Sequence, residues 1–262
     1  YFLAMLCIAF TSAISFAQLG TDVYTLGLDD ADNYSVTSWN TTTQGTGFSD
    51  WVFDTSTPNG GFTGRFLGSF SAALDVNSNS FGLFANSGSN ATSGATRSLP
   101  QTLQEEDVFT IAIGVNFRDG AKGFDLRDAS NNTILNFNVG SDDYTIDGTI
   151  LFSNAYDANT VITFTFTQNA TTLDWTAVRS GGSTGTQSGT KNAVNAGTIT
   201  NLRLYNVSAG TNNDGGAGER NLYFNSLEFT SKYTINNNST AASDSDITLP
   251  YLTVESGSTV NI

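Results

Sequence analysis

Apolar and polar residues alternate with a period of two along most of this 262-residue chain. Successive side chains of a β-strand point to opposite faces, so the alternation is typical of strands with one buried and one solvated face. Between residues 21 and 232 no window carries a convincing 3.6-residue apolar period, which a helix would need. The clearest expected strands are residues 108–117, 133–139, 161–167, 173–178, 199–207 and 221–229.

Turn-forming dipeptides separate several of these runs. Asp119-Gly120, Asn131-Asn132 and Asp147-Gly148 accept positive φ angles and therefore close tight hairpins. Residues 144–152 alone predict a hairpin with a two-residue loop. The Ser/Thr/Gly-rich stretch at 180–189 is expected to be a loop. These signals together predict an all-β fold, an antiparallel jelly-roll β-sandwich.

Composition excludes several functional classes. Ten Lys and Arg residues stand against 24 Asp and Glu, which gives a formal net charge of −14. Such a chain repels phosphate backbones, so we expect no nucleic-acid partner. The chain has no His, which removes the commonest general base and every mechanism that depends on it. No recognisable catalytic constellation remains, and we expect the protein not to be an enzyme.

The first 17 residues form an apolar, uncharged run that ends in Ser15-Phe16-Ala17. That pattern is typical of a signal peptide, so we expect cleavage after Ala17, a secreted or cell-surface location, and no membrane insertion of the remaining chain. The only cysteine, Cys7, lies in this segment. The mature protein is therefore expected to contain no disulfide.

Four segments are expected along the chain. A signal peptide at 1–17 precedes a β-sandwich domain at 18–232. A polar, low-complexity linker follows at 233–248. Residues 249–262 resume an alternating pattern, and we expect them to be the start of a second β module.

Short motifs between residues 22 and 232 resemble a known module. In chain order they are DNYS at 32–35, GTGFSDW at 45–51, GGF at 60–62, FLG at 66–68, SFGLFAN at 80–86, VNFRDG at 115–120, KGFDLR at 122–127 and RNLYFN at 220–225. This pattern is similar to the N-terminal concanavalin-like or laminin-G-like β-sandwich of secreted multidomain Bacteroidetes proteins. The resemblance implies the same sandwich fold and export by the type IX route. It implies no activity.

Three tryptophans, Trp39, Trp51 and Trp175, are the candidates for stacking on sugar rings. The alternative is that they fill the core of a domain without disulfides. For Trp39 and Trp51 the core is the favoured interpretation, and Trp175 shares the face of Leu173 and Ala177, which favours the core as well.

A Gly-broken acidic stretch at 212–219 is the candidate metal site. Asn212, Asn213, Asp214 and Glu219 offer the oxygen ligands that calcium prefers, and neither His nor a second Cys is present to favour a transition metal. An inter-strand loop without a metal is the alternative. The oxygen-rich stretch at 29–33 is a second, weaker calcium candidate.

Two charged clusters have alternative interpretations. The acidic cluster at 105–107 invites a glycosidase hypothesis, but consecutive residues of a strand face opposite ways, which favours a solvated turn before the strand at 108. Arg118, Lys122 and Arg127 offer a basic patch for an acidic polysaccharide. Ion pairs with Asp119, Asp125 and Asp128 are the favoured alternative.

These features together predict a secreted, non-catalytic β-sandwich module that binds carbohydrate or mediates surface adhesion, with a polysaccharide or cell-surface glycan as its partner. One alternative is an accessory or catalytic domain of an extracellular polysaccharide-degrading hydrolase. A structural spacer is the other alternative.

Overall fold

Strands make up almost all of the regular structure in the computed structural model, which describes residues 22–35, 39, 42–57, 62–86, 90–153, 155–210 and 220–233. The elements of this part are β1 (Asp22–Asp29), the 3-10 helix η1 (Ala31–Asn33), β2 (Val52–Ser56), β3 (Thr63–Gly68), β4 (Ser80–Ala85), β5 (Thr92–Ser98), β6 (Val108–Val115), β7 (Ala121–Arg127), β8 (Thr133–Val139), β9 (Tyr144–Ile146), β10 (Thr149–Phe152), β11 (Val161–Gln168), β12 (Thr172–Ser180), β13 (Gly185–Asn192), β14 (Asn201–Val207) and β15 (Leu222–Tyr233).

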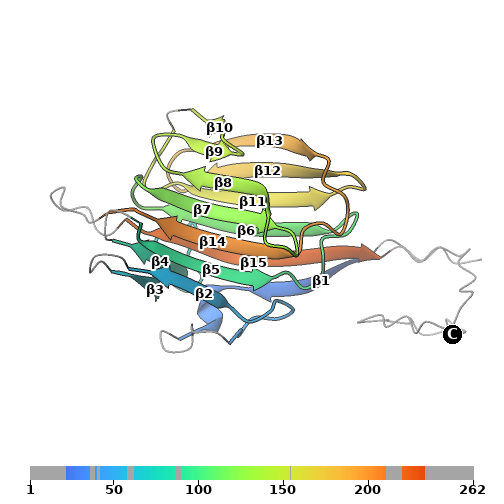
Figure 1. The fold of residues 1–262 in the computed structure, drawn as a ribbon, viewed down its shortest axis with the longest axis horizontal. Helices are drawn as coiled ribbons and strands as arrows, with labels where there is room; N and C mark the ends of the chain where they lie inside the picture. The colour runs from blue at the N-terminus through green and yellow to red at the C-terminus, as the bar shows by residue number, and fades with distance from the viewer. Residues whose placement is uncertain are drawn as a thin grey trace, which may run out of the picture. The chain divides into compact units, whose positions relative to one another are not determined.

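The strands form two antiparallel sheets that stack into a sandwich (Figure 1). One sheet has the order β13-β12-β11-β6-β15-β4-β3, and β1 also pairs with β15. The other has the order β10-β9-β8-β7-β14-β5-β2. The chain passes repeatedly from one sheet to the other, for example at β4, β5, β6 and β7, as jelly rolls do. The predicted all-β jelly-roll sandwich is confirmed.

A row of aromatic side chains crosses the inner face of the first sheet. Phe229 pairs with Phe109, Phe109 with Phe166, and Phe166 with Trp175 on β12. The three phenylalanines are fully buried, whereas Trp175 is only partly buried. The row ends on the edge strand β13 at Gly189, which pairs with Trp175. The aromatic rings in the middle of the sheet are therefore fully buried, whereas the last ring of the row, at the β13 edge, is partly exposed.

Strand predictions agree with the structure except at β13. The expected strands at 108–117, 133–139, 161–167, 173–178, 199–207 and 221–229 correspond to β6, β8, β11, β12, β14 and β15. The hairpin at 144–152 is present, with φ of 48° at Asp147 and 74° at Gly148. The loop expected at 180–189 is wrong from Gly185 onward, because β13 begins there. An edge strand buries little, so β13 carries no apolar alternation by which to recognise it.

A buried ion pair connects the two sheets. Asp29 ends β1 in one sheet, and Arg97 lies on β5 in the other. Both side chains are fully buried, and the Arg97 guanidinium donates to Asp29 Oδ2. No disulfide can link the two sheets, because the only cysteine of the chain is Cys7.

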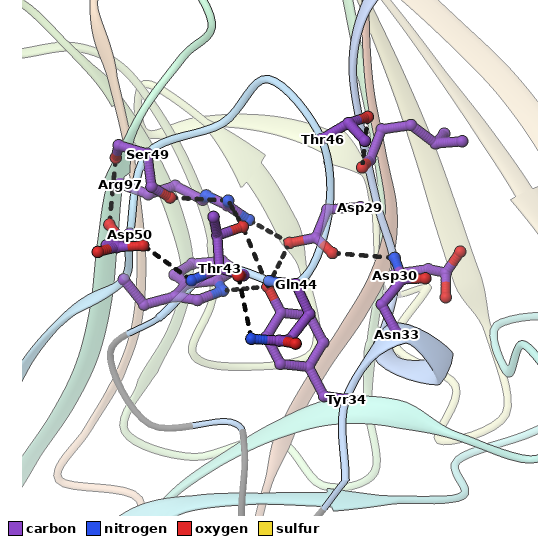
Figure 2. A network of polar contacts seen from close by, with 12 residues as sticks. Asp29, Asp30, Asn33, Tyr34, Thr43, Gln44, Thr46, Ser49, Asp50 and Arg97 are labelled. Atoms are coloured by element: carbon purple, nitrogen blue, oxygen red, sulfur yellow. Dashed lines mark hydrogen bonds and ion pairs between the residues drawn. The ribbon is translucent and has the colours of Figure 1, made fainter.

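Hydrogen bonds around the ion pair join Asp29 and Arg97 to Tyr34, Thr43 and Ser49 (Figure 2). Arg97 Nη2 donates to Thr43 Oγ1 at 2.9 Å and to the Ser49 carbonyl at 2.8 Å. The Tyr34 hydroxyl donates to Asp29 Oδ2 at 2.8 Å. The arginine also lies 4.3 Å from the centroid of the Trp51 ring. Each charge is therefore compensated by several partners, which a buried ion pair requires.

Residues 1–21 and 234–262 lie outside the described residues, and with them lie the signal peptide, most of the linker and the second β module that the sequence predicts. The described strands belong to one unit, Asp22–Tyr233. Within the described ranges no helix is long and apolar enough to span a membrane.

We predict that Arg97→Met lowers the free energy of unfolding by about 3–5 kcal/mol, because it leaves the Asp29 carboxylate buried without its cation. Urea unfolding of the variant and the wild type measures this loss. Arg118→Met is the matched control. Arg118 pairs with Asp142 where both side chains are about half exposed, so its loss should cost at most about 1 kcal/mol. Equal losses in the two variants would contradict the assigned role of the buried pair.

Candidate functional site

A cavity of about 230 Å³ lies where the edges of the two sheets meet. In Figure 1 the edge strands β10 and β13 both lie at the top of the view. The residues that line the cavity come from the β9–β10 hairpin and from β12 and β13, and they are Ile146, Asp147, Thr149, Ile150, Leu151, Trp175, Gly189, Thr190 and Lys191. We call this cavity the edge cleft.

Trp175 supplies the aromatic surface of the edge cleft, and Gly189 makes room for it. A Cβ atom at Gly189 would lie 2.5 Å from Trp175 Cζ2 and 2.8 Å from Cε2, closer than real Cβ contacts. The missing side chain therefore lets the indole lie against the backbone of β13. Because no β13 side chain covers it at this position, the indole borders the cavity.

An ion pair joins the two sheets within the edge cleft. Lys191 Nζ on β13 lies 2.6 Å from Asp147 Oδ2 in the β9–β10 turn. The two side chains are 35% and 31% exposed, so water and solutes reach both of them. Asp147 is fixed by Asn136, whose backbone N–H donates to Asp147 Oδ1 at 3.0 Å and whose carbonyl accepts from the Asp147 N–H at 2.9 Å. The pair is thus accessible and well positioned.

Apolar groups complete the lining, and the Thr190 side chain faces the other side of the sheet, where it contacts Asp174. Ile150 is 53% exposed and offers an apolar contact. The Thr190 hydroxyl donates to Asp174 Oδ1 at 2.6 Å, and the Asn169 amide donates to Oδ2 at 2.9 Å. These two hydrogen bonds hold the pKa of the Asp174 carboxyl below its usual range. The edge cleft therefore combines an indole, aliphatic groups and one ion pair.

Trp39 and Trp51 do not take part in the edge cleft. Their side chains are 4% and 1% exposed, and their rings pack against each other at 6.2 Å between centroids. Both also pack against Phe81. Neither indole has a face available to a ligand, so the structure places both tryptophans in the core, the interpretation that the sequence favoured for them.

The two candidate calcium sites have different outcomes. Asn212, Asn213, Asp214 and Glu219 lie outside the described residues, so calcium binding there stays a prediction. The calcium site considered at the 29–33 stretch is not supported by the structure. The Asp29 carboxylate there already accepts hydrogen bonds from Arg97, Tyr34 and Asn33. Within the described ranges, no group of three or more acidic, His or Cys residues is placed to hold a metal ion.

The other charged clusters serve local structure. Glu105 and Glu106 are exposed in a turn, while Asp107 is buried and accepts from the backbone N–H of Gln104 at 2.8 Å. This agrees with the solvated turn expected there. Two pairings differ from those expected: Arg118 pairs with Asp142, and Asp119 pairs with Arg220 at 2.9 Å.

The three basic residues predicted as a possible patch are used separately. Arg127 pairs with Asp125 at 2.8 Å, as expected. Lys122 is fully buried on β7 and donates to the Asp119 carbonyl. Burial lowers the pKa of the Lys122 ammonium to about 7, opposed by the charge of Asp119 and reinforced by that of Arg220. An acidic polysaccharide has no exposed basic surface to contact at Lys122.

Comparisons with known proteins find low similarity. The chain is similar to a protein of unknown function from Shewanella oneidensis MR-1, with 10% identity, 88% of this chain and 98% of that chain covered, and a TM-score of 0.48. It is also similar to the CBM2 module of the evolved Dit of Lactobacillus casei BL23 phage J-1, with 12% identity, coverage of 83% and 99%, and a TM-score of 0.49. A third similar structure is a GH131 β-glucanase catalytic domain from Podospora anserina. It has 9% identity, the match covers 77% of this chain and 89% of that chain, and the TM-score is 0.45.

No protein-family model matches the chain, and no curated protein matches its sequence. With TM-scores below 0.5 and identities near 10%, the similar structures carry no weight for function.

Sequence reasoning named Trp175 as a sugar-stacking candidate but favoured the core for it, and it missed Gly189, Asp147 and Lys191 as its neighbours. The pairing of β12 with β13 brings Gly189 to the indole, and the pairing of β9 with β10 brings the Asp147 turn to the same edge. A signal for the first pairing was present in the sequence, because Gly185, Gln187, Gly189 and Lys191 alternate with the hydroxyl residues Thr186, Ser188 and Thr190. Nothing in the sequence indicated that the two edges meet.

We predict that Trp175 is the one tryptophan that acrylamide quenches efficiently, because the other two are buried. Trp175→Phe should therefore remove the quenchable part of the tryptophan fluorescence, and Trp51→Phe should leave it. Stern–Volmer titrations of the two folded variants test this. Efficient quenching that persists in Trp175→Phe would show that another indole is exposed.

We predict that Lys122 makes stability depend on pH above neutrality. Its folded-state pKa is lowered to about 7, so between pH 7 and 10 the unfolded chain binds more protons than the folded chain. Stability should therefore rise with pH in this window, by up to about 1.4 kcal/mol per pH unit. Urea midpoints at pH 7, 8 and 9 measure the slope, which Lys122→Met should reduce. An unchanged slope in Lys122→Met would contradict the prediction.

Proposed function

We propose that this protein is a non-catalytic carbohydrate-binding module and that the edge cleft is its binding site. The observation that carries the proposal is the partly buried Trp175 indole at a cavity between the two sheet edges. Sugar rings present an apolar face of C–H groups and an edge of hydroxyls. The indole matches the first, and the Asp147–Lys191 pair matches the second.

The volume of the edge cleft limits the size of its ligand and therefore the affinity. At about 230 Å³ it falls below the range of about 300–1,000 Å³ that holds drug-sized ligands, and it suits one sugar unit of a longer chain. At about 0.3 kcal/mol per non-hydrogen atom, one hexose unit binds with a Kd of the order of 1 mM. Assays for weak binding, such as affinity electrophoresis, are therefore the appropriate ones.

The single carboxyl group among the lining residues of the edge cleft supports a non-catalytic role. Glycoside hydrolysis uses two carboxyl groups on either side of the scissile bond. Among the lining residues only Asp147 carries a carboxyl group, and Lys191 holds it in an ion pair. The arrangement favours binding over hydrolysis.

The proposed location is extracellular. The apolar run at 1–17 with Ala17 at its end supports secretion. The motifs between residues 22 and 232 resemble those of secreted Bacteroidetes proteins, and from that resemblance we propose export by the type IX route as well.

We predict that Trp175→Ala weakens binding to a polysaccharide at least tenfold, because the ring loses its stacking surface. Affinity electrophoresis against a panel of soluble polysaccharides identifies a ligand and then compares the variants. Phe62→Ala is the matched control, because Phe62 is 72% exposed and lies outside the edge cleft. Its affinity should equal that of the wild type. A folded Trp175→Ala protein that binds as well as the wild type would refute the proposed site.

A further inference from the structure

We infer that the edge cleft selects an uncharged sugar unit with two adjacent free ring hydroxyls, and that the Asp147–Lys191 ion pair is the selecting element. This inference rests on the proposed function, because it names the ligand class of the same site. Its basis is the position, the accessibility and the charge balance of the pair.

The pair presents a donor and an acceptor side by side. Lys191 Nζ and Asp147 Oδ2 are 2.6 Å apart, which is close to the separation of the oxygens of two adjacent ring hydroxyls. An ammonium has three donors, and Asp147 takes one of them. One sugar hydroxyl donates to Asp147 Oδ2 while its neighbour accepts from Lys191 Nζ. Hydrogen bonds to charged groups are the stronger ones, so this contact discriminates between sugars.

The pair also lies at the right place relative to the indole. Trp175 pairs with Gly189, and Lys191 stands two residues further along β13, so both positions face the same side of the sheet. Two residues of a strand span about 7 Å, comparable to the width of a sugar ring. A ring stacked on Trp175 therefore extends its hydroxyl edge toward Lys191 and Asp147.

Charge balance disfavours acidic sugars. Among the described residues, Asp147 and Lys191 are the only charged ones that line the edge cleft, and they neutralise each other. The whole chain carries a formal net charge of −14, which repels polyanions. An uncharged sugar meets no such penalty.

Three probes with different hydroxyl patterns test the inference. Internal units of cellohexaose carry free adjacent hydroxyls at C2 and C3, whereas internal units of laminarihexaose do not, because C3 is linked. Oligogalacturonate has the adjacent hydroxyls and a carboxylate. We expect the wild type to bind cellohexaose several-fold more tightly than laminarihexaose and to bind oligogalacturonate most weakly. NMR titrations give the three dissociation constants.

Variants of the pair sharpen the test. Lys191→Met keeps the aliphatic stem and should weaken cellohexaose binding about tenfold. Asp147→Asn keeps a residue that tolerates the positive φ of the turn. It leaves the lysine without its counter-ion, so it should weaken cellohexaose binding and strengthen oligogalacturonate binding. Lys232→Met is the control, because Lys232 pairs with Glu106 outside the edge cleft.

The outcomes separate this inference from the proposed function. The inference is overturned, and the module function retained, if Trp175→Ala abolishes binding while Lys191→Met and Asp147→Asn leave the three affinities unchanged. Equal or tighter binding of laminarihexaose overturns it as well. If none of the three probes binds, the inference fails, and a polysaccharide panel decides the proposed function separately.

Discussion

The buried contact between Arg97 and Asp29 is the interaction on which the arrangement of the sheets depends. It joins β5 of one sheet to the end of β1 in the other, with both side chains fully buried. Burying two charges costs several kcal/mol each, and the loss is offset only where the geometry and the additional hydrogen bonds are good. Thr43, Ser49 and Tyr34 supply those hydrogen bonds. The end of β1 and the described residues Tyr34, Thr43 and Ser49 are thereby joined to the sandwich without a disulfide.

The core is less completely buried at the edge strand β13 than at the centre of the sheet, and the candidate site lies at this edge. At the centre, Phe109 and Phe166 are fully buried, but the row of rings ends at Trp175 and Gly189. An edge strand that ends the row with a glycine leaves one indole partly exposed beside the other sheet. The Asp147–Lys191 pair then connects the two edges. An indole and an ion pair at one open edge are the physical basis of the proposed sugar site.

The sequence predicted the fold well because the signals were local. Alternation at 161–167 and the Asp147-Gly148 turn each specify a strand or a hairpin without reference to distant residues. It did not predict β13, whose polar residues bury little, and it did not predict the Arg97–Asp29 pair, whose members are 68 residues apart. It named Trp175 as a candidate, but the edge cleft depends on strand order and on the meeting of two sheets. Strand order and the meeting of two sheets depend on residues far apart in the chain, so a local alternation of apolar and polar residues does not predict them.

The central claim is that Trp175 in the edge cleft contacts a sugar. The most direct measurement is a ¹⁵N–¹H NMR titration that follows the indole N–H signals of the three tryptophans as cellohexaose is added. The account predicts that the Trp175 signal shifts progressively with the ligand concentration, together with backbone signals of β10 and β13. The signals of the buried Trp39 and Trp51 should stay in place. Saturable shifts confined to another face of the sandwich, with Trp175 unchanged, would contradict it.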